Sequence, residues 1–303
     1  MTSRFSAPFF LAFAGACMMV GPLAAEEMTR LPAGSEHDGS LGSRNGGIVV
    51  GADSIVNGEI DSRNGNIELG ARVTAAAVRS RNGSIEVGDG GQYGPVDSRN
   101  GAIVIGRGTR AGTVSSRNGG VAIRAESEVD GVETRNGAIA LAENVIVSGG
   151  LRTRNGAILA ESGAVVSGAV SSRNGDFRLH AGGRVDADVT TRNGAIELLG
   201  ASVGQNVQSR GGDIRLAEKA RVGGDVIIEI EDDDQSGGGW FGSGGSYPDA
   251  GSIHILDGSI VEGDVIVALP DDYDGEIPEV VIAADATING EVRLDPRVTR
   301  TTR

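Results

Sequence analysis

The chain has 303 residues, of which 50 are glycine and only 3% are aromatic, so aromatic rings cannot form its core. Its formal charge of −14 argues against general nucleic-acid binding, because domains that bind nucleic acid usually carry a net basic surface. Nucleic acid is therefore not expected as a partner.

Residues 1–25 have the form of a secretory signal peptide. Arg4 supplies the positive start, residues 8–20 are apolar but too short to span a bilayer comfortably, and small residues up to Ala25 offer a cleavage site. The alternative is a lipoprotein signal, in which Cys17 would carry the lipid. No later segment is apolar for long enough to cross a membrane, so we expect an extracytoplasmic protein, either periplasmic, at the cell surface or secreted.

Residues 26–42 are a polar lead-in, which we expect to form an N-terminal cap. A Ser/Thr-Arg-Asn-Gly motif follows and returns every 18 or 19 residues, the last time weakened to Ser-Arg-Gly-Gly. Such a fixed period indicates a repeat architecture. The ten copies begin at Ser43, Ser62, Ser80, Ser98, Ser116, Thr134, Thr153, Ser172, Thr191 and Ser209.

Each repeat places apolar residues at fixed, alternating positions. In the copy at Ser98, these are Val96, Ile103 and Ile105, and the same positions are apolar in the other copies. Alternation with period 2 predicts short strands with one buried face, and the Ser or Thr of the motif falls on that face. Asn and Gly both tolerate positive φ, so we expect the Asn-Gly pair to turn the chain at a corner.

Two architectures fit these strands. Asn-Gly is a strong hairpin signal, so the repeats could form an antiparallel meander, but a meander would leave exposed edges and an unburied apolar face. In a solenoid, each repeat becomes one turn with three short strands, and neighbouring turns supply the backbone hydrogen bonds. We therefore predict an all-β fold, a single parallel β-solenoid of about 12 turns of 18–19 residues, with right-handed coiling.

The regular repeats are expected over residues 43–227, followed by irregular turns and a C-terminal cap over residues 228–303. Two loops interrupt this last part, at residues 231–250 and 269–278. Trp240 and Phe241 lie among glycines in the first loop, either as an exposed tip or as a flap over the open end of the solenoid.

The pattern Ser/Thr-x-Asn-Gly-x-Ile-x-Leu, followed by Val-x-Gly-x-Val, resembles bacterial adhesin proteins with β-strand repeats. The final turns, such as residues 260–265, resemble those of the polymer-forming, bactofilin-like proteins. The resemblance covers residues 43–294 and implies a right-handed solenoid with a surface, envelope or scaffold role. It brings no catalytic residues, and the Arg inside the motif departs from the general pattern.

The Arg of each motif follows an inward residue, so the ten arginines should stack on the outside, one per turn. One hypothesis is a linear site for an anionic polysaccharide or an envelope lipid, because guanidinium groups bind carboxylate and phosphate at two points. The alternative is structural, with the guanidiniums bonding turn carbonyls and nearby Glu. The predicted column contains Arg44, Arg63, Arg81, Arg99, Arg117, Arg135, Arg154, Arg173, Arg192 and Arg210.

Two further sets of polar side chains could interact. The motif asparagines, Asn45 through Asn193, are expected to form a ladder of side-chain hydrogen bonds between turns, as side chains do in cross-β structures. The two acidic loops could meet and bind Ca²⁺, although a solvated acidic surface is the simpler interpretation. The carboxylates of this hypothetical metal site are Asp232, Asp233, Asp234, Asp271, Asp272 and Asp274.

Catalysis finds no support in the sequence. His37, His180 and His254 are scattered, and no hydrolase nucleophile motif is present. We expect no enzyme activity and no cofactor. The expected function is that of an exported, adhesin-like scaffold of the envelope or matrix that self-associates. The alternative is a monomeric binding module that presents the arginine column to an anionic glycan or lipid headgroup.

Overall fold

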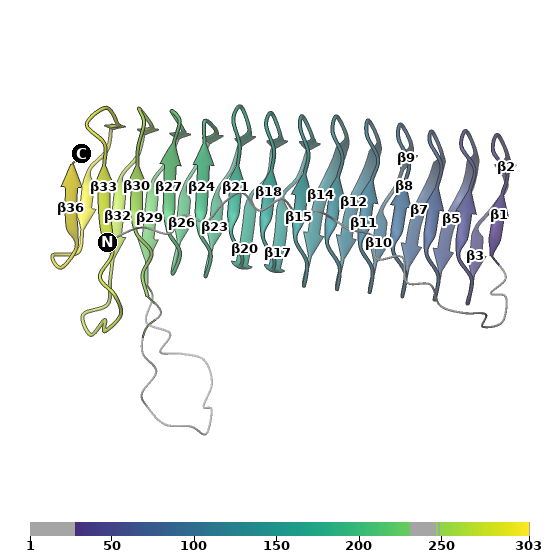
Figure 1. Cartoon of the computed structure of the whole chain (residues 1–303), viewed down its shortest axis with the longest axis horizontal. Coiled ribbons are helices and arrows are strands. Elements are labelled where there is room, and N and C mark those ends of the chain that lie inside the picture. Colours follow the sequence, from purple (N-terminus) through teal and green to yellow (C-terminus); the bar gives the residue numbers. More distant parts are fainter. Residues whose placement is uncertain (1–27, 231–246, 248, 303) are drawn as a thin grey trace, which may run out of the picture.

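A computed structural model describes residues 28–230, 247 and 249–302. Within this part of the chain there is no helix, and 36 strands stack in parallel into one long rod (Figure 1). The predicted all-β, single parallel β-solenoid is confirmed. The predicted signal peptide and the Trp240–Phe241 pair lie outside the described residues.

One face of the rod, here called the first face, is a 14-stranded parallel sheet with one strand from each turn of the solenoid. Its strands are β1 (Thr29–Leu31), β4 (Ile48–Val50), β6 (Ile67–Leu69), β8 (Ile85–Val87), β11 (Ile103–Ile105), β13 (Val121–Ile123), β15 (Ile139–Leu141), β18 (Ile158–Ala160), β21 (Phe177–Leu179), β24 (Ile196–Leu199), β27 (Ile214–Ala217), β30 (Ile253–Ile255), β33 (Glu279–Ile282) and β36 (Thr299–Thr302).

The sheet therefore gives about 14 turns rather than the predicted 12. The lead-in supplies a turn, because β1 pairs in register with β4, and the last residues supply another, because β36 pairs with β33. Sequence periodicity missed both, since neither carries the motif. With about 4.8 Å between neighbouring strands, the rod is about 60 Å long.

The second and third faces share a 22-stranded parallel sheet. Four long strands run across both faces: β5 (Ile55–Ser62), β7 (Thr74–Ser80), β12 (Arg110–Ser116) and β14 (Glu128–Thr134). The second face also contains β2 (Glu36–His37), β9 (Gln92–Tyr93), β16 (Ile146–Val147), β19 (Val165–Val166), β22 (Arg184–Val185), β25 (Ser202–Val203), β28 (Arg221–Val222), β31 (Ile260–Val261) and β34 (Thr287–Ile288). The third face also contains β3 (Leu41–Ser43), β10 (Val96–Ser98), β17 (Leu151–Asn155), β20 (Val170–Asn174), β23 (Val189–Thr191), β26 (Val207–Ser209), β29 (Val226–Glu229), β32 (Val265–Ala268) and β35 (Val292–Leu294).

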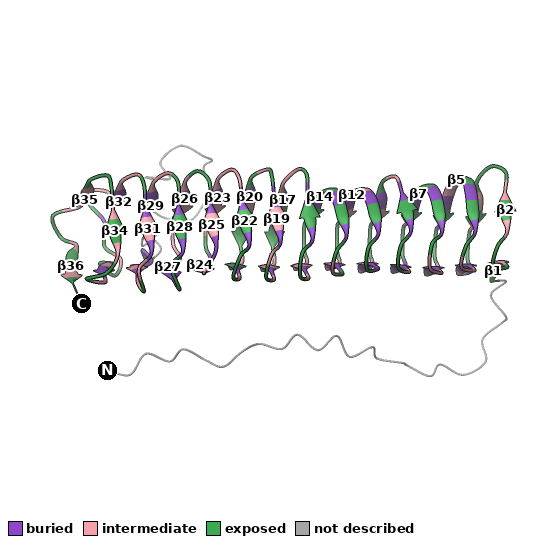
Figure 2. Cartoon of the chain, turned by 90° about the horizontal axis from the view of Figure 1, so that it is seen from above, coloured by how far each residue is buried: buried purple, intermediate pink, exposed green. Residues whose placement is uncertain are grey.

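The core is a continuous column of mostly aliphatic side chains inside the rod, with Phe177 and two tyrosines among them. Ile103, Ile105 and Val114 are fully buried, and along most strands buried residues alternate with more exposed ones (Figure 2). The prediction that the motif Ser or Thr points inward is confirmed, since Ser98 and Ser116 are buried. The Ser116 hydroxyl donates a hydrogen bond of 3.0 Å to a carbonyl oxygen of the preceding turn, so its burial leaves no unpaired donor.

The motif glycine corrects one expectation. We expected positive φ at Asn-Gly, but within the described residues the positive-φ positions fall elsewhere, for example at Gly108 and Gly163. The glycine is needed instead for close approach of two backbones. A Cβ atom on Gly101 would lie 2.2 Å from the carbonyl oxygen of Gly83, the equivalent glycine of the preceding turn. Any side chain at this corner would therefore push the stacked turns apart.

Candidate functional site

The arginine column lies at the edge of the third face, immediately after the buried Ser or Thr of each turn. Its backbone is held in register, because the Arg99 amide donates to the Ser80 carbonyl at 3.0 Å and the Asn100 amide to the Arg81 carbonyl at 3.1 Å. Parallel pairing therefore sets the distance between the backbones of successive arginines at about 4.8 Å. From Arg44 to Arg173 every side chain of the column is exposed, and Arg192 and Arg210 are half-buried.

The asparagine ladder beside the column forms as predicted. In each step the side-chain amide nitrogen of one Asn donates to the amide oxygen of the Asn in the preceding turn. The distance is 2.7 Å from Asn118 to Asn100 and 2.8 Å from Asn136 to Asn118. The chain of bonds is continuous from Asn45 to Asn193. In these turns the ladder fixes the corner that follows the arginine, so the backbone that carries the arginine is held rigidly.

Eight arginines of the column, Arg44 through Arg173, make no side-chain hydrogen bond or ion pair within the described residues. The structural alternative, in which they bond turn carbonyls and nearby Glu, therefore has no such bond at these positions. Several arginines elsewhere on the rod behave differently. Arg72 bonds Asp53 at 2.6 Å, and this hydrogen bond lowers the pKa of the Asp53 carboxyl group.

A second row of outward side chains, here called the flanking row, runs beside the column on the third face. Each member stands two residues before its arginine and pairs in register with the next member along the rod. The flanking row contains Asp61, Arg79, Asp97, Ser115, Glu133, Arg152, Ser171, Thr190 and Gln208.

The C-terminal half of the column borders a groove of about 600 Å³. Between Glu133 and Gln208 the flanking row holds one carboxylate, one guanidinium and uncharged polar groups, so the groove is basic. Arg152 makes no ion pair or side-chain hydrogen bond within the described residues. The outward side chains that line the groove are Glu133, Arg135, Arg152, Arg154, Ser171, Arg173, Thr190, Arg192 and Arg210.

The N-terminal half carries a similar arginine in the flanking row, but that arginine is neutralised. Arg79 bonds Glu59 at 2.6 Å and lies 3.6 Å from an oxygen of Asp97. Asp97 also accepts a hydrogen bond from the hydroxyl group of Ser115, which is the next member of the flanking row. In this half Arg79, Asp97 and Ser115 of the flanking row are therefore linked to one another.

The hypothetical metal site is not assembled from the described residues. Within the parts of the chain that the structure describes, no three His, Cys, Asp or Glu side chains gather in a way that could hold a metal ion. Asp232, Asp233 and Asp234 lie outside those parts. The Tyr247 hydroxyl donates to Asp272 at 2.9 Å, and the Tyr247 amide donates to Asp274 at 3.0 Å.

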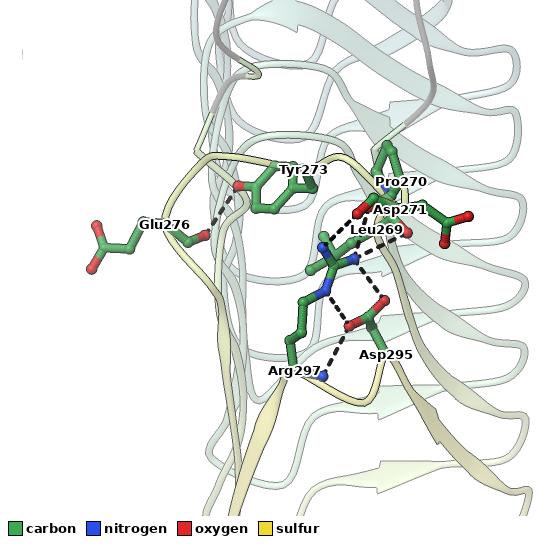
Figure 3. A network of polar contacts seen from close by, with 7 residues as sticks. All are labelled: Leu269, Pro270, Asp271, Tyr273, Glu276, Asp295 and Arg297. Atoms are coloured by element: carbon green, nitrogen blue, oxygen red, sulfur yellow. Dashed lines mark hydrogen bonds and ion pairs between the residues drawn. The ribbon is translucent and has the colours of Figure 1, made fainter.

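The loop at residues 269–278 is instead fixed by hydrogen bonds to its backbone (Figure 3). The Arg297 guanidinium donates to the carbonyl oxygens of Leu269, Pro270 and Asp271, and Asp295 holds the same guanidinium at 2.8 Å. The Tyr273 hydroxyl donates to the carbonyl oxygen of Glu276 at 3.0 Å. These contacts hold the backbone of the loop in place.

The three histidines lie in separate turns, His37 in β2, His254 in β30 and His180 just after β21. They do not form a constellation with one another. Across the described residues we find no helix with the length and apolar character needed to cross a bilayer.

The predicted site residues did not include Arg152, Ser171 and Thr190, which also line the groove, because the prediction was restricted to the invariant position of the motif. A signal was present in the sequence, since residues two positions apart on a strand point to the same side. The sequence could not show that Arg79 would be neutralised and that Arg152 would not, because the carboxylate of Glu59 reaches Arg79 from the neighbouring turn.

Comparison of the chain with protein-family models gives no match, and comparison with curated proteins and with solved structures gives none either. The assignment of a function therefore depends on the geometry of the site.

Proposed function

We propose that this chain is an exported, rigid rod that binds a linear polyanion, such as an acidic polysaccharide, along the arginine column. The observation that carries the proposal is the set of eight exposed arginines from Arg44 to Arg173, which stand in register without a partner in the described residues. Like charges about 4.8 Å apart repel one another, and a bound polyanion would relieve that repulsion. The proposed role is binding rather than catalysis.

The regular spacing supports a linear ligand over a compact one. A stack of turns presents one guanidinium per step along a straight line, and each guanidinium can form two parallel hydrogen bonds with a carboxylate or a phosphate. The asparagine ladder supports the same proposal, because a rigid base lowers the entropy that the site loses when the ligand binds. The net charge of −14 favours binding at the column over binding elsewhere on the protein, because the acidic remainder of the rod would repel a polyanion.

The test is a fourfold replacement at the centre of the column, Arg99→Gln, Arg117→Gln, Arg135→Gln and Arg154→Gln. We expect the wild-type protein to be retained on an immobilised acidic polysaccharide and released by salt, because exposed charges are screened within about 8 Å at physiological ionic strength. The variant should lose this salt-sensitive retention. Unchanged retention would refute the proposal.

A matched control removes the same charge outside the column. Its four positions hold arginines that are already paired with carboxylates: Arg72, Arg107, Arg110 and Arg221. Their replacement by Gln should leave retention unchanged. Equal loss in both variants would mean that net charge, and not the column, governs binding.

A second candidate function is that of an envelope or matrix scaffold formed by end-to-end association. Among the described residues, β1, β2 and β3 at one end of the rod pair only with the following turn, and β34, β35 and β36 at the other end pair only with the preceding turn. Leu41 and Leu294 at these ends are only partly buried. Open strand edges are templates for pairing with another chain, and head-to-tail contacts extend into filaments.

Electron microscopy of the chain from residue 26, at several protein concentrations, tests the scaffold candidate. Filaments whose length increases with concentration would support it. Single rods of about 60 Å at every concentration, the length given by about 4.8 Å per turn, would refute it.

A further inference from the structure

The turn that contains β17 differs from the others in the groove. Arg152 and Arg154 stand on either side of buried Thr153, so both point outward from the same strand, and neither has a partner within the described residues. Arg152 pairs in register with Ser171, and Thr153 with Ser172, which places Arg173 beside Arg154 in the following turn. Three arginines and Ser171 thus stand at adjacent outward positions of two neighbouring turns and line the same groove, as one patch of donors.

This arrangement has more donors than a carboxylate needs. A carboxylate offers two oxygens and a single negative charge, and one guanidinium can already contact both oxygens in the two-point mode. A phosphate monoester has three terminal oxygens and a charge of about −1.5 to −2 at neutral pH, so it can accept bonds from several guanidiniums and a hydroxyl together. We infer that the patch of Arg152, Arg154, Ser171 and Arg173 binds a phosphate monoester group. This inference rests on the proposed function, which it makes specific.

The electrostatics around the patch favour a doubly charged group. Glu133 is the one carboxylate among the residues that line the groove, and it forms no ion pair with Arg152. Among the described residues the groove is open on its outer side, so a phosphate carried on a polymer could enter it without displacing any of them. A phosphorylated polysaccharide and a lipid with a phosphate monoester headgroup share this chemistry, and the experiment below separates them.

The experiment measures the affinity of the full protein for three soluble probes of matched charge density: dextran phosphate, dextran sulfate and polygalacturonate. Arg152→Gln should weaken the binding of dextran phosphate about tenfold or more, the effect of losing a hydrogen bond to a charged group, and the binding of polygalacturonate less than about twofold. Arg79→Gln is the matched control, because Arg79 occupies the same row but is neutralised by Glu59. It should change neither affinity.

The dependence on pH provides a readout that a purely structural role would not change. The second ionisation of a phosphate monoester has a pKa near 6, so affinity for dextran phosphate should rise between about pH 5 and about pH 7.5. Sulfate and uronate groups keep their charge over that range, so their affinities should stay level. Arg152→Lys keeps the charge but loses the two-point geometry, and it should restore less than half of the lost affinity.

The outcomes separate this inference from the proposed function. If Arg152→Gln weakens all three probes equally, or if binding of dextran phosphate is independent of pH, the patch is not selective for phosphate although the column still binds polyanions. If no probe binds, both proposals fail. Vesicles that contain phosphatidic acid identify the source. Binding to them that is lost in Arg152→Gln supports a lipid headgroup, and binding to dextran phosphate alone supports a soluble or polymer-borne phosphate.

Discussion

The two halves of the arginine column have the same motif and the same backbone geometry, yet they differ in what stands beside the arginines. In the N-terminal half, Arg79 is bound by Glu59 and lies near Asp97, and Ser115 donates to Asp97. In the C-terminal half, Arg152 has no partner in the described residues and borders the groove. A repeated motif therefore creates a repeated surface, while non-repeated neighbours decide which part of that surface is available to a ligand.

The largest effect should come from removing three adjacent arginines from one half at a time. We expect loss of either set to weaken polyanion binding, because each contact with a charged group contributes about 1 kcal/mol or more. Loss of the C-terminal set should weaken it more than about thirtyfold, and loss of the N-terminal set should have a smaller effect, because only the C-terminal set of the two lines the groove. Isothermal titration with one acidic polysaccharide measures both. Equal losses would mean that the flanking row has no role. The two sets are Arg135, Arg154 and Arg173, and Arg81, Arg99 and Arg117.

A smaller effect, in the opposite direction, should follow from converting the N-terminal half into a copy of the other. Glu59→Gln combined with Asp97→Asn removes the two carboxylates that pair with Arg79 and leaves Asp61 in register with it, as Glu133 is in register with Arg152. The released guanidinium would stand beside Arg81 as Arg152 stands beside Arg154, so affinity should rise about threefold to fivefold, within the range of a single charged contact. Replacing Glu128, whose partner Arg110 lies on the second face, is the control and should have no effect.

Glu133 permits a finer test inside the groove. Its carboxylate is in register with Arg152 and can compete with a ligand for that guanidinium. Glu133→Gln should tighten binding about twofold, the size expected for an exposed charge pair. The gain should disappear in the presence of Arg152→Gln, which a double-mutant cycle would measure. If Glu133→Gln still increases the affinity when Arg152 is replaced, Glu133 acts on the arginines of the column and not on Arg152.

A substitution in the core of the N-terminal half, at Tyr93, should have no effect on ligand binding. The Tyr93 hydroxyl is buried and has no hydrogen-bond partner among the described residues, and Tyr93 pairs in register with Ala75 and Ala111 of the neighbouring turns. Tyr93→Phe removes this unpaired group and should raise the free energy of unfolding by about 1 kcal/mol. Chemical denaturation would measure the gain, and titration should show unchanged affinity. A change in affinity would mean that the halves differ in core packing as well as in charge.

The same variant has a defined pH dependence. Burial raises the pKa of Tyr93 above its ordinary value near 10. Above about pH 10 the unfolded chain would release this proton while the folded chain keeps it, so wild-type stability should fall as the pH rises. Tyr93→Phe should show a shallower fall. Tyr273 also has a raised pKa and contributes equally to both proteins.

Much of the fold could be predicted because the repeat is explicit. The alternation around Ser98 identifies the inward positions, and the structure confirms them at Ile103 and Ile105. The first and last turns could not be predicted from the motif, because β1 and β36 belong to the solenoid only through pairing with β4 and β33. The use of the motif glycine was also misread, since the contact that excludes a side chain at Gly101 comes from Gly83 in another turn.

The sequence by itself determined the period, the strands, the inward residues and the column of arginines. These depend on alternation and on spacing, which are local properties of the chain. Only the tertiary structure decided which arginines have partners, because a carboxylate that is about twenty residues away in sequence lies one turn away in space. Arg79 and Arg152 occupy equivalent positions in the repeat, but the carboxylate of Glu59 reaches Arg79, whereas no carboxylate in the described residues pairs with Arg152.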